Sequence, residues 1–208
     1  MQITIFGATG SLGSLVARQA LEKGYFVTAF TRNPEKLQAL KYPNLTTVRG
    51  DVHNLTDIEK AVKGKQAVLC ALGDGTKGRV RGPGTLNIIE AMSKMGVRRL
   101  ICQSTLGLGD SWNNLNFFWK HAMFGFLLRK AFTDHQLQEK YIFNSKLDFT
   151  IVRSSAFTNG DLTHQYKVGF DDKFKNLSLK IARADVAYFM LQQLTSNEFI
   201  GKPVSISN

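Results

Sequence analysis

The chain has 208 residues, enough for one domain with a sizeable core, and its two cysteines exclude a disulfide-stabilised scaffold. Both, Cys70 and Cys102, lie in apolar runs, as buried thiols of a reducing compartment do. The formal charge of +11 would suit nucleic acid, but the Lys and Arg residues are scattered and form no known binding motif, so we expect no nucleic-acid partner. Because the first strand begins at once and no apolar run is long enough to span a membrane, we expect no leader and a cytoplasmic protein without an integral membrane segment.

The first residues combine a short strand with a glycine-rich turn. Residues 2–6 alternate apolar with polar and then run apolar, as a buried strand does, and Gly7, Gly10 and Gly13 follow at a spacing of three. Gly7 permits a sharp turn, Gly10 lets a pyrophosphate approach the backbone, and Gly13 lets the next helix pack closely on the sheet. The free N–H groups of a helix that starts near Ser11 form an anion site. The stretch therefore predicts a dinucleotide-binding loop.

Strands and helices alternate along the rest of the chain. The helix after the glycine loop ends at Lys23-Gly24, and that over 83–95 should bury Leu86, Ile88, Ile89 and Met92. We predict further strands over 25–30, 45–48, 67–72, 99–103, 148–153 and 203–206, and further helices over 55–62, 133–145 and 182–194. Such alternation predicts an α/β fold with a doubly wound parallel sheet, the Rossmann arrangement, in a single domain over 1–208 with a small C-terminal appendage on the substrate side.

An aromatic insertion at about 110–132 interrupts this pattern. The apolar residues from Trp112 to Leu128 nearly encircle a helix, so we expect the segment to be buried in the core, to join copies of the chain, or to fold over a ligand. It follows the carboxyl end of a strand, where parallel sheets bind ligands. We predict that the segment covers a bound acceptor, and that Lys120, Arg129 and Lys130 supply positive charge for an anionic group of that acceptor.

The residues after the second strand indicate which dinucleotide binds. A carboxylate about twenty residues past the glycine loop would hold the ribose hydroxyls of NAD, but residues 30–33 are Phe-Thr-Arg-Asn. Arg32 offers a planar fork for a 2′-phosphate, and Lys36 adds a second cation on the same turn. The predicted cofactor is therefore NADP(H), the alternative being that both are ordinary surface cations.

Two further stretches belong to the same expected pocket. Asp51 and Val52 follow the third strand, where the aspartate can accept a hydrogen bond from the adenine amino group or, alternatively, cap the next helix. Leu72 and Gly73 end the fourth strand, where small residues let the backbone pass close to the cofactor.

These motifs resemble the atypical short-chain dehydrogenase/reductase group, most closely its biliverdin reductase B (flavin reductase) and NmrA-like branch. The matching stretches are 6–13, 31–36, 50–52, 71–73, 104–105 and 133–153, and the likeness as a whole covers nearly the entire chain. The resemblance implies that the nicotinamide lies near Ser104 and Thr105. Together with the motifs above, the resemblance gives the following expected cofactor contacts: Gly7, Thr9, Gly10, Ser11, Leu12, Gly13, Arg32, Lys36, Asp51, Val52, Leu72, Gly73 and Ser104.

The chain also departs from its relatives at the usual catalytic positions. Most active short-chain dehydrogenases carry Tyr-x-x-x-Lys, but Tyr141 is followed at that spacing by Ser145, with Lys146 one residue too far. We therefore do not expect Tyr141 to act as the general acid. Biliverdin reductase B also lacks this motif and has a histidine just after the sixth strand, where this chain has Ala156.

The remaining candidates suit a reaction that needs little acid catalysis. A reduced flavin or quinone can take its proton from solvent, so positioning is the main demand. We predict an NADPH-dependent reductase of a planar, conjugated small molecule, a flavin, quinone or bilin-like pigment, with Ser104, Thr105 and His164 as candidate catalytic residues. His164 lies after the sixth strand and could donate a proton, although a lone histidine is more often structural. No spacing of His, Cys, Asp and Glu suggests a metal site.

Three alternatives stay open at this point. An NmrA-like sensor would bind NADP(H) without turnover, and an assembly factor would use this fold as a scaffold and bind a protein through residues 112–128. A sugar-nucleotide epimerase ranks lower because it needs Tyr-x-x-x-Lys. Residues 112–128 are also the candidate interface of an oligomer.

Overall fold

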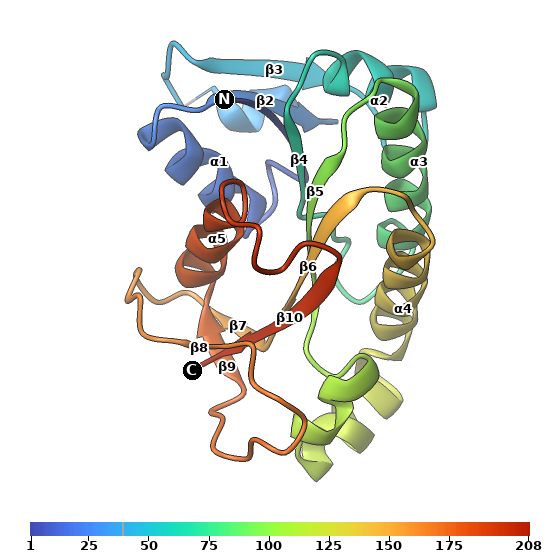
Figure 1. The fold of residues 1–208 in the computed structure, drawn as a ribbon, viewed down its shortest axis with the longest axis vertical. Coiled ribbons are helices and arrows are strands. Elements are labelled where there is room, and N and C mark those ends of the chain that lie inside the picture. Colours follow the sequence, from blue (N-terminus) through green and yellow to red (C-terminus); the bar gives the residue numbers. More distant parts are fainter. Residues whose placement is uncertain (39) are drawn as a thin grey trace.

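An eight-stranded sheet organises the computed structural model, which describes residues 1–38 and 40–208 (Figure 1). The strand order is β3-β2-β1-β4-β5-β6-β10-β8, and each of these pairs is parallel except β10 with β8. The strands are β1 (Gln2–Phe6), β2 (Phe26–Thr31), β3 (Leu45–Arg49), β4 (Ala67–Cys70), β5 (Arg99–Thr105), β6 (Asp148–Ser154), β8 (Lys167–Val168) and β10 (Lys202–Ser207). The predicted doubly wound parallel sheet is confirmed, with its switch point between β1 and β4.

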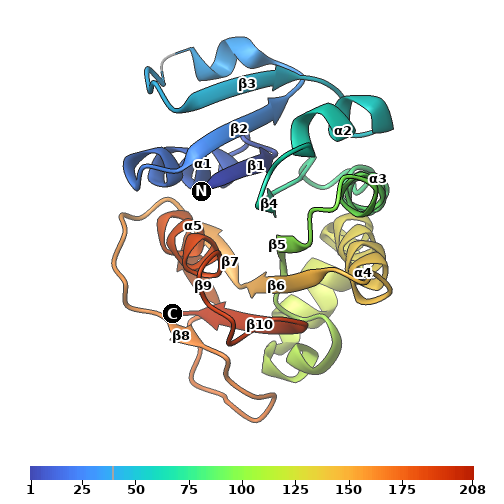
Figure 2. The ribbon, with the colours of Figure 1, turned by 45° about the horizontal axis from the view of Figure 1, so that its top comes forward.

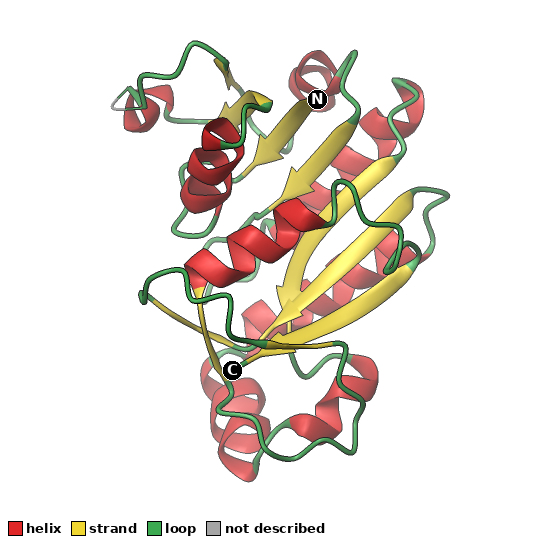
Figure 3. Ribbon diagram, turned by 60° about the vertical axis from the view of Figure 1, so that its left-hand side comes forward, coloured by secondary structure: helices red, strands yellow, loops and turns green. Residues whose placement is uncertain are grey.

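Helices cover both faces of this sheet, as Figures 2 and 3 show. Helices α1 (Gly13–Glu22) and α5 (Arg183–Gln192) contact each other on one face. On the other face α3 (Arg81–Lys94) packs between α2 (Leu55–Val62) and α4 (Arg129–Phe143). Each layer buries its own apolar cluster against the strands, one containing Val16 and Val186 and the other Ile58 and Ile88. A short second sheet, β7 (Ala156–Thr158) with β9 (Lys180–Ala182), lies beside the carboxyl end of β6.

Helix α3 differs from the sequence prediction in one part of its buried face. Ile88, Ile89 and Met92 are buried as expected, but the prediction for Leu86 is wrong because 41% of that residue is exposed. Leu86 precedes Ile88 by two positions, which is about 200° around an α-helix. The two side chains therefore lie on nearly opposite sides of the helix.

The aromatic segment forms a short 3-10 helix, η2 (Gly109–Asn114), followed by a π-helix, η3 (Phe118–Leu127). It lies at one end of the molecule, near the bottom of Figure 1. Leu115 and Phe124 are buried in a third apolar cluster, whereas Phe117 and Phe126 are 78% and 84% exposed. The segment thus has a buried inner face and an exposed apolar outer face.

No helix within residues 1–38 and 40–208 has the length and apolar character needed to cross a membrane. The other described elements are the 3-10 helix η1 (Pro34–Leu37) and the loop that carries β8 between β7 and β9.

Candidate functional site

The glycine loop lies at the switch point of the sheet and shows why glycine is needed there. Gly7 has a φ of +81°, and a Cβ at this position would collide with the carbonyl oxygen of Ala71, the residue just after β4. A Cβ on Gly13 would collide with the carbonyl of Gly7. These close approaches leave an open polar cleft of about 180 Å³ over the carboxyl ends of β1 to β4.

The start of α1 is free to receive an anion. Its first position is preceded by Leu12, and no described side chain caps the helix. The backbone N–H groups of Ser11, Leu12 and Gly13 donate to no acceptor within residues 1–38 and 40–208. Free N–H groups at the positive end of a helix fit the pyrophosphate of a dinucleotide.

Most of the expected cofactor residues come together in this cleft. Its lining includes Gly7, Thr9, Gly10, Arg32, Lys36, Asp51, Val52, Leu72 and Gly73. Three others lie beside the cleft rather than on its wall, because Ser11 is exposed while Leu12 and Gly13 are buried behind the loop. Asp51 does not cap α2, since the side chain of Asn54 accepts the N–H of Asp57 and fills that role.

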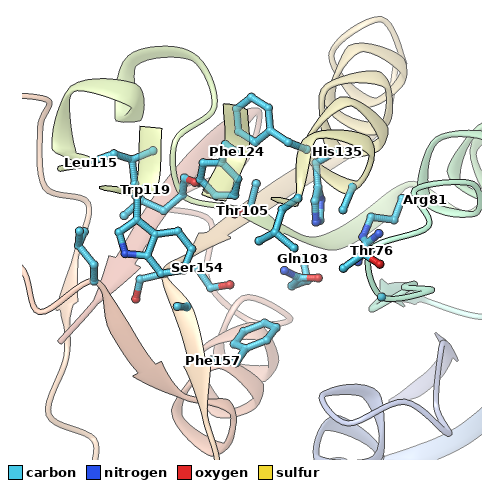
Figure 4. Close-up of a pocket in the computed structure, with 18 of the residues that line it drawn as sticks. Thr76, Arg81, Gln103, Thr105, Leu115, Trp119, Phe124, His135, Ser154 and Phe157 are labelled. Carbon is cyan, nitrogen blue, oxygen red and sulfur yellow. Dashed lines mark hydrogen bonds between the residues drawn. The ribbon is translucent and has the colours of Figure 1, made fainter. Parts of the chain in front are cut away.

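A second, mostly apolar cavity of about 410 Å³ lies next to the cleft, over the carboxyl ends of β5 and β6 (Figure 4). The cleft and the cavity adjoin at two residues: Gly73, which lines the cleft, lies beside the guanidinium of Arg81, which lines the cavity. The inner face of the aromatic segment forms one wall through Trp119 and Phe124. The remaining lining residues are Gly75, Thr76, Gln103, Thr105, Leu106, Leu115, Leu128, Ala131, Phe132, His135, Ser154, Ser155, Ala156, Phe157, Leu179 and Arg183.

Ser104 and Thr105 point to opposite sides of β5, as neighbouring residues of a strand do. Thr105 lines the cavity and its hydroxyl donates to the carbonyl of Leu106 at 3.1 Å. Ser104 is fully buried away from the cavity, and its Oγ donates to Oε1 of Glu139 at 2.7 Å. The structure therefore brings Thr105, but not Ser104, to the surface where an acceptor would lie.

Glu139 is the centre of a buried ionic network beneath the cavity. Both its carboxylate oxygens accept from Arg153, at 3.0 and 2.7 Å, and Arg153 also donates to Asp110 at 2.6 Å. Burial lowers the pKa of Arg153, but the hydrogen bonds and charges of Glu139 and Asp110 outweigh this and raise it above its ordinary value. The network joins α4 to β6 and to the start of the aromatic segment, and Ser104 is part of it.

His135 is a cavity residue that the sequence reasoning missed. It is buried on α4, and its Nδ1 lies 3.1 Å from Oε1 of Gln138, whose amide donates to Thr85. Burial, and then the positive charge of Arg81, lower the pKa of His135 to about 3. The imidazole is therefore neutral near pH 7 and cannot act as a cationic acid there. Only the rotation of α4 directs it into the cavity, and no local sequence signal carries that information.

The other candidate side chains lie outside the cavity. His164 has a φ of +57°, its N–H donates to Asp185 at 2.8 Å, and its ring packs edge-on against Tyr188. The three cations of the insertion that were expected to supply charge for an anionic group of the acceptor are not among the residues that line the cavity. Lys120 lies over the ring of Trp112, and Arg129 and Lys130 are exposed at the start of α4.

Two other expectations concern Tyr141 and metals. Tyr141 packs against the apolar cluster beneath α3 rather than lining the cavity. Helix α4 ends at Phe143, before the position where a lysine partner would be needed. Within the part of the chain that the structure describes, no group of His, Cys, Asp and Glu is arranged to hold a metal ion.

Comparison with known proteins places these observations in a family. A model described as NAD(P)H-binding matches residues 7–197. An uncharacterised chloroplastic protein of Arabidopsis thaliana, At2g34460, is 31% identical over 99% of this chain and 76% of its own length. Because that relative is chloroplastic, a cytoplasmic location for this chain stays a prediction.

Two solved structures show the same fold. The oxidoreductase ylbE of Lactococcus lactis superposes with a TM-score of 0.85 at 24% identity, covering 100% of this chain and 91% of ylbE. ChuY, an anaerobilin reductase of Escherichia coli O157:H7, superposes with a TM-score of 0.82 at 22% identity, covering 99% of this chain and 96% of ChuY.

Proposed function

This chain belongs to the family described as NAD(P)H-binding, and we propose that it is an oxidoreductase that uses NADPH to reduce a planar, conjugated acceptor such as a flavin, a quinone or a bilin-like pigment. The observation that carries the proposal is the aromatic-walled cavity that adjoins the cofactor cleft at Gly73 and Arg81. Flat rings such as those of Trp119 and Phe124 favour a flat acceptor. The bilin substrate of ChuY, a protein of the same fold, is of this kind.

The cleft supports NADPH in preference to NADH. Arg32 and Lys36 line it just beyond β2, where a carboxylate would select the ribose of NAD. The free N–H groups before α1 would hold the pyrophosphate, and Asp51 would face the adenine. When bound, NADPH would supply the hydride. Because Gly73 has no side chain, it would leave room for the cofactor to extend from the cleft toward the cavity.

The side chains of the cavity position an acceptor but offer it no strong acid. His135 is neutral, and the hydroxyl of Thr105 is a hydrogen-bond donor with little acidity. Tyr141 lies outside the cavity. This chemistry favours acceptors that take their proton from solvent after hydride transfer, as flavins and quinones do.

The test compares aromatic residues on the two faces of η3. Trp119→Ala and Phe124→Ala remove rings from the cavity wall, and Phe126→Ala is the matched control because its ring is 84% exposed. NADPH oxidation is measured with a flavin and with a quinone as acceptors. We expect each inner substitution to raise the acceptor KM by roughly fivefold, about 1 kcal/mol of stacking, while NADPH affinity and the control stay unchanged.

Two results would contradict the proposal. If the inner variants lose only thermal stability and keep the acceptor kinetics of the parent, the segment is core and the substrate lies elsewhere. If NADPH binds but no acceptor is reduced by the parent protein, the chain is a cofactor sensor rather than a reductase.

A further inference from the structure

Arg183 is a cation on the wall of the cavity. It is the first residue of α5, and its guanidinium carbon lies 5.0 Å from the centre of the Phe157 ring. Its Nη1 donates to the carbonyl of Thr158 and the side chain of Asn159, both uncharged groups. Within residues 1–38 and 40–208 it forms no salt bridge with a carboxylate.

Two buried donors at this wall also find no hydrogen-bond partner in the part of the chain that the structure describes. The Nε of Arg183 is buried without a hydrogen bond, and so is the Oγ of Ser155, a residue that is 6% exposed and also lines the cavity. Ser155 lies between β6 and β7, and Arg183 follows β9, so separate elements bring the two donors to one cavity. Buried donors are nearly always satisfied in native proteins, because an unpaired donor loses its hydrogen bonds to water and gains none in return.

The position of Arg183 on its helix makes an unpaired charge less favourable still. The N-terminal end of a helix carries partial positive charge, so a cation there is repelled rather than stabilised. A bound anion would compensate the charge of the guanidinium and interact favourably with the N-terminal end of α5.

Arg81 provides a contrast on the same cavity. Its Nε is also buried without a partner, but its Nη1 lies 3.5 Å from Asp74 and 3.7 Å from Asp134. The backbone N–H groups of Arg81 and Gly82 donate to Asp134 as well, which ties the start of α3 to α4. The charge of Arg81 is therefore compensated within the protein, whereas that of Arg183 is not.

We propose that Arg183 and Ser155 form a subsite for a carboxylate or phosphate group of the acceptor. This inference concerns the anionic group of the acceptor, and it rests on the proposed function, which accounts for the planar part of the same molecule. It narrows the substrate class to conjugated acceptors that carry an anionic side group, and it ranks neutral quinones below them.

The experiment uses pairs of acceptors that share a ring system and differ in the anionic group. FMN and riboflavin differ by a phosphate, and biliverdin and its dimethyl ester differ by two carboxylates, so the two pairs distinguish the two sources of negative charge. The variants are Arg183→Gln, Arg183→Lys and Ser155→Ala. Arg129→Gln is the matched control, because it removes an arginine that begins another helix but lies outside the cavity.

Arg183→Gln should raise the KM of FMN or of biliverdin at least roughly tenfold, as expected for loss of a charge-assisted pair, with riboflavin or the ester changed less than about twofold. Arg183→Lys should restore part of the affinity because it keeps the charge without the fork. Ser155→Ala should weaken the charged acceptor by roughly threefold, and it leaves the helix intact if Arg183→Gln fails to fold. The control should behave as the parent.

Calorimetric titration of each acceptor into protein saturated with NADP⁺ gives a readout without turnover. Tighter binding of the charged member of either pair, lost in Arg183→Gln, would support the subsite even if no acceptor were reduced, in which case only the proposed function would fail. If the parent binds both members of each pair equally, or if Arg183→Gln weakens both members equally, the subsite is refuted while reductase activity stands.

Discussion

The buried His135 predicts that the protein loses stability in mild acid. Its pKa falls from 6.5 to about 3 on folding, first because it is buried and second because of the positive charge of Arg81. The hydrogen bond with Gln138 acts in the opposite direction but does not outweigh these effects. At a pH between about 3 and 6.5, the unfolded chain therefore binds up to one more proton at His135 than the folded chain does.

The sign and size of the effect follow from that proton. Stability from a neutral, buried His135 is fully present above pH 6.5 and is lost progressively as the pH falls toward 3. For these two pKa values, lowering the pH from about 7 to about 5 removes about 2 kcal/mol from the free energy of unfolding.

The assay is urea unfolding of the parent, His135→Gln and His121→Gln at about pH 7 and about pH 5. Glutamine does not titrate and can still hydrogen-bond to Gln138, so His135→Gln should lose about 2 kcal/mol of the pH dependence seen in the parent. His121 is exposed on the aromatic segment, and its replacement should leave the pH dependence unchanged. An unaltered pH dependence in His135→Gln would refute the reasoning.

Two predictions concern the cofactor and the reaction. Arg32→Glu should raise the Kd of NADPH by roughly ten- to a hundredfold and change the Kd of NADH little. The reason is that the substitution replaces the fork that binds the 2′-phosphate by a carboxylate that repels it. Equal affinity of the parent protein for NADPH and NADH would contradict this prediction. Tyr141→Phe should change kcat less than about tenfold, whereas Thr105→Val should lower kcat more, because, of these two residues, Thr105 lines the cavity and Tyr141 does not. Steady-state kinetics of the two variants test this prediction. A drop in kcat of roughly a thousandfold in Tyr141→Phe would show that Tyr141 is catalytic.

The sequence by itself was sufficient for the parallel strands of the sheet and for most of the residues that line the cleft, but not for the antiparallel edge strand β8. The glycine loop, the strand before it and the helix after it are local features, and their spacing follows from turn geometry and apolar periodicity. Arg32 and Asp51 lie just beyond the ends of β2 and β3, and parallel strands bring these ends to one edge of the sheet. The sequence therefore located these two residues, because their places depend on the ends of their own strands.

Only the tertiary structure decided what lines the acceptor cavity. Ser104 and Thr105 must point to opposite faces of β5, but helices cover both faces of this sheet, so the alternation does not reveal which residue meets an acceptor. His135 and Arg183 belong to helices that pack on opposite faces and reach the same cavity. Their meeting depends on how each helix is rotated and packed against distant parts of the chain, and no local pattern of residues encodes a contact between such distant segments.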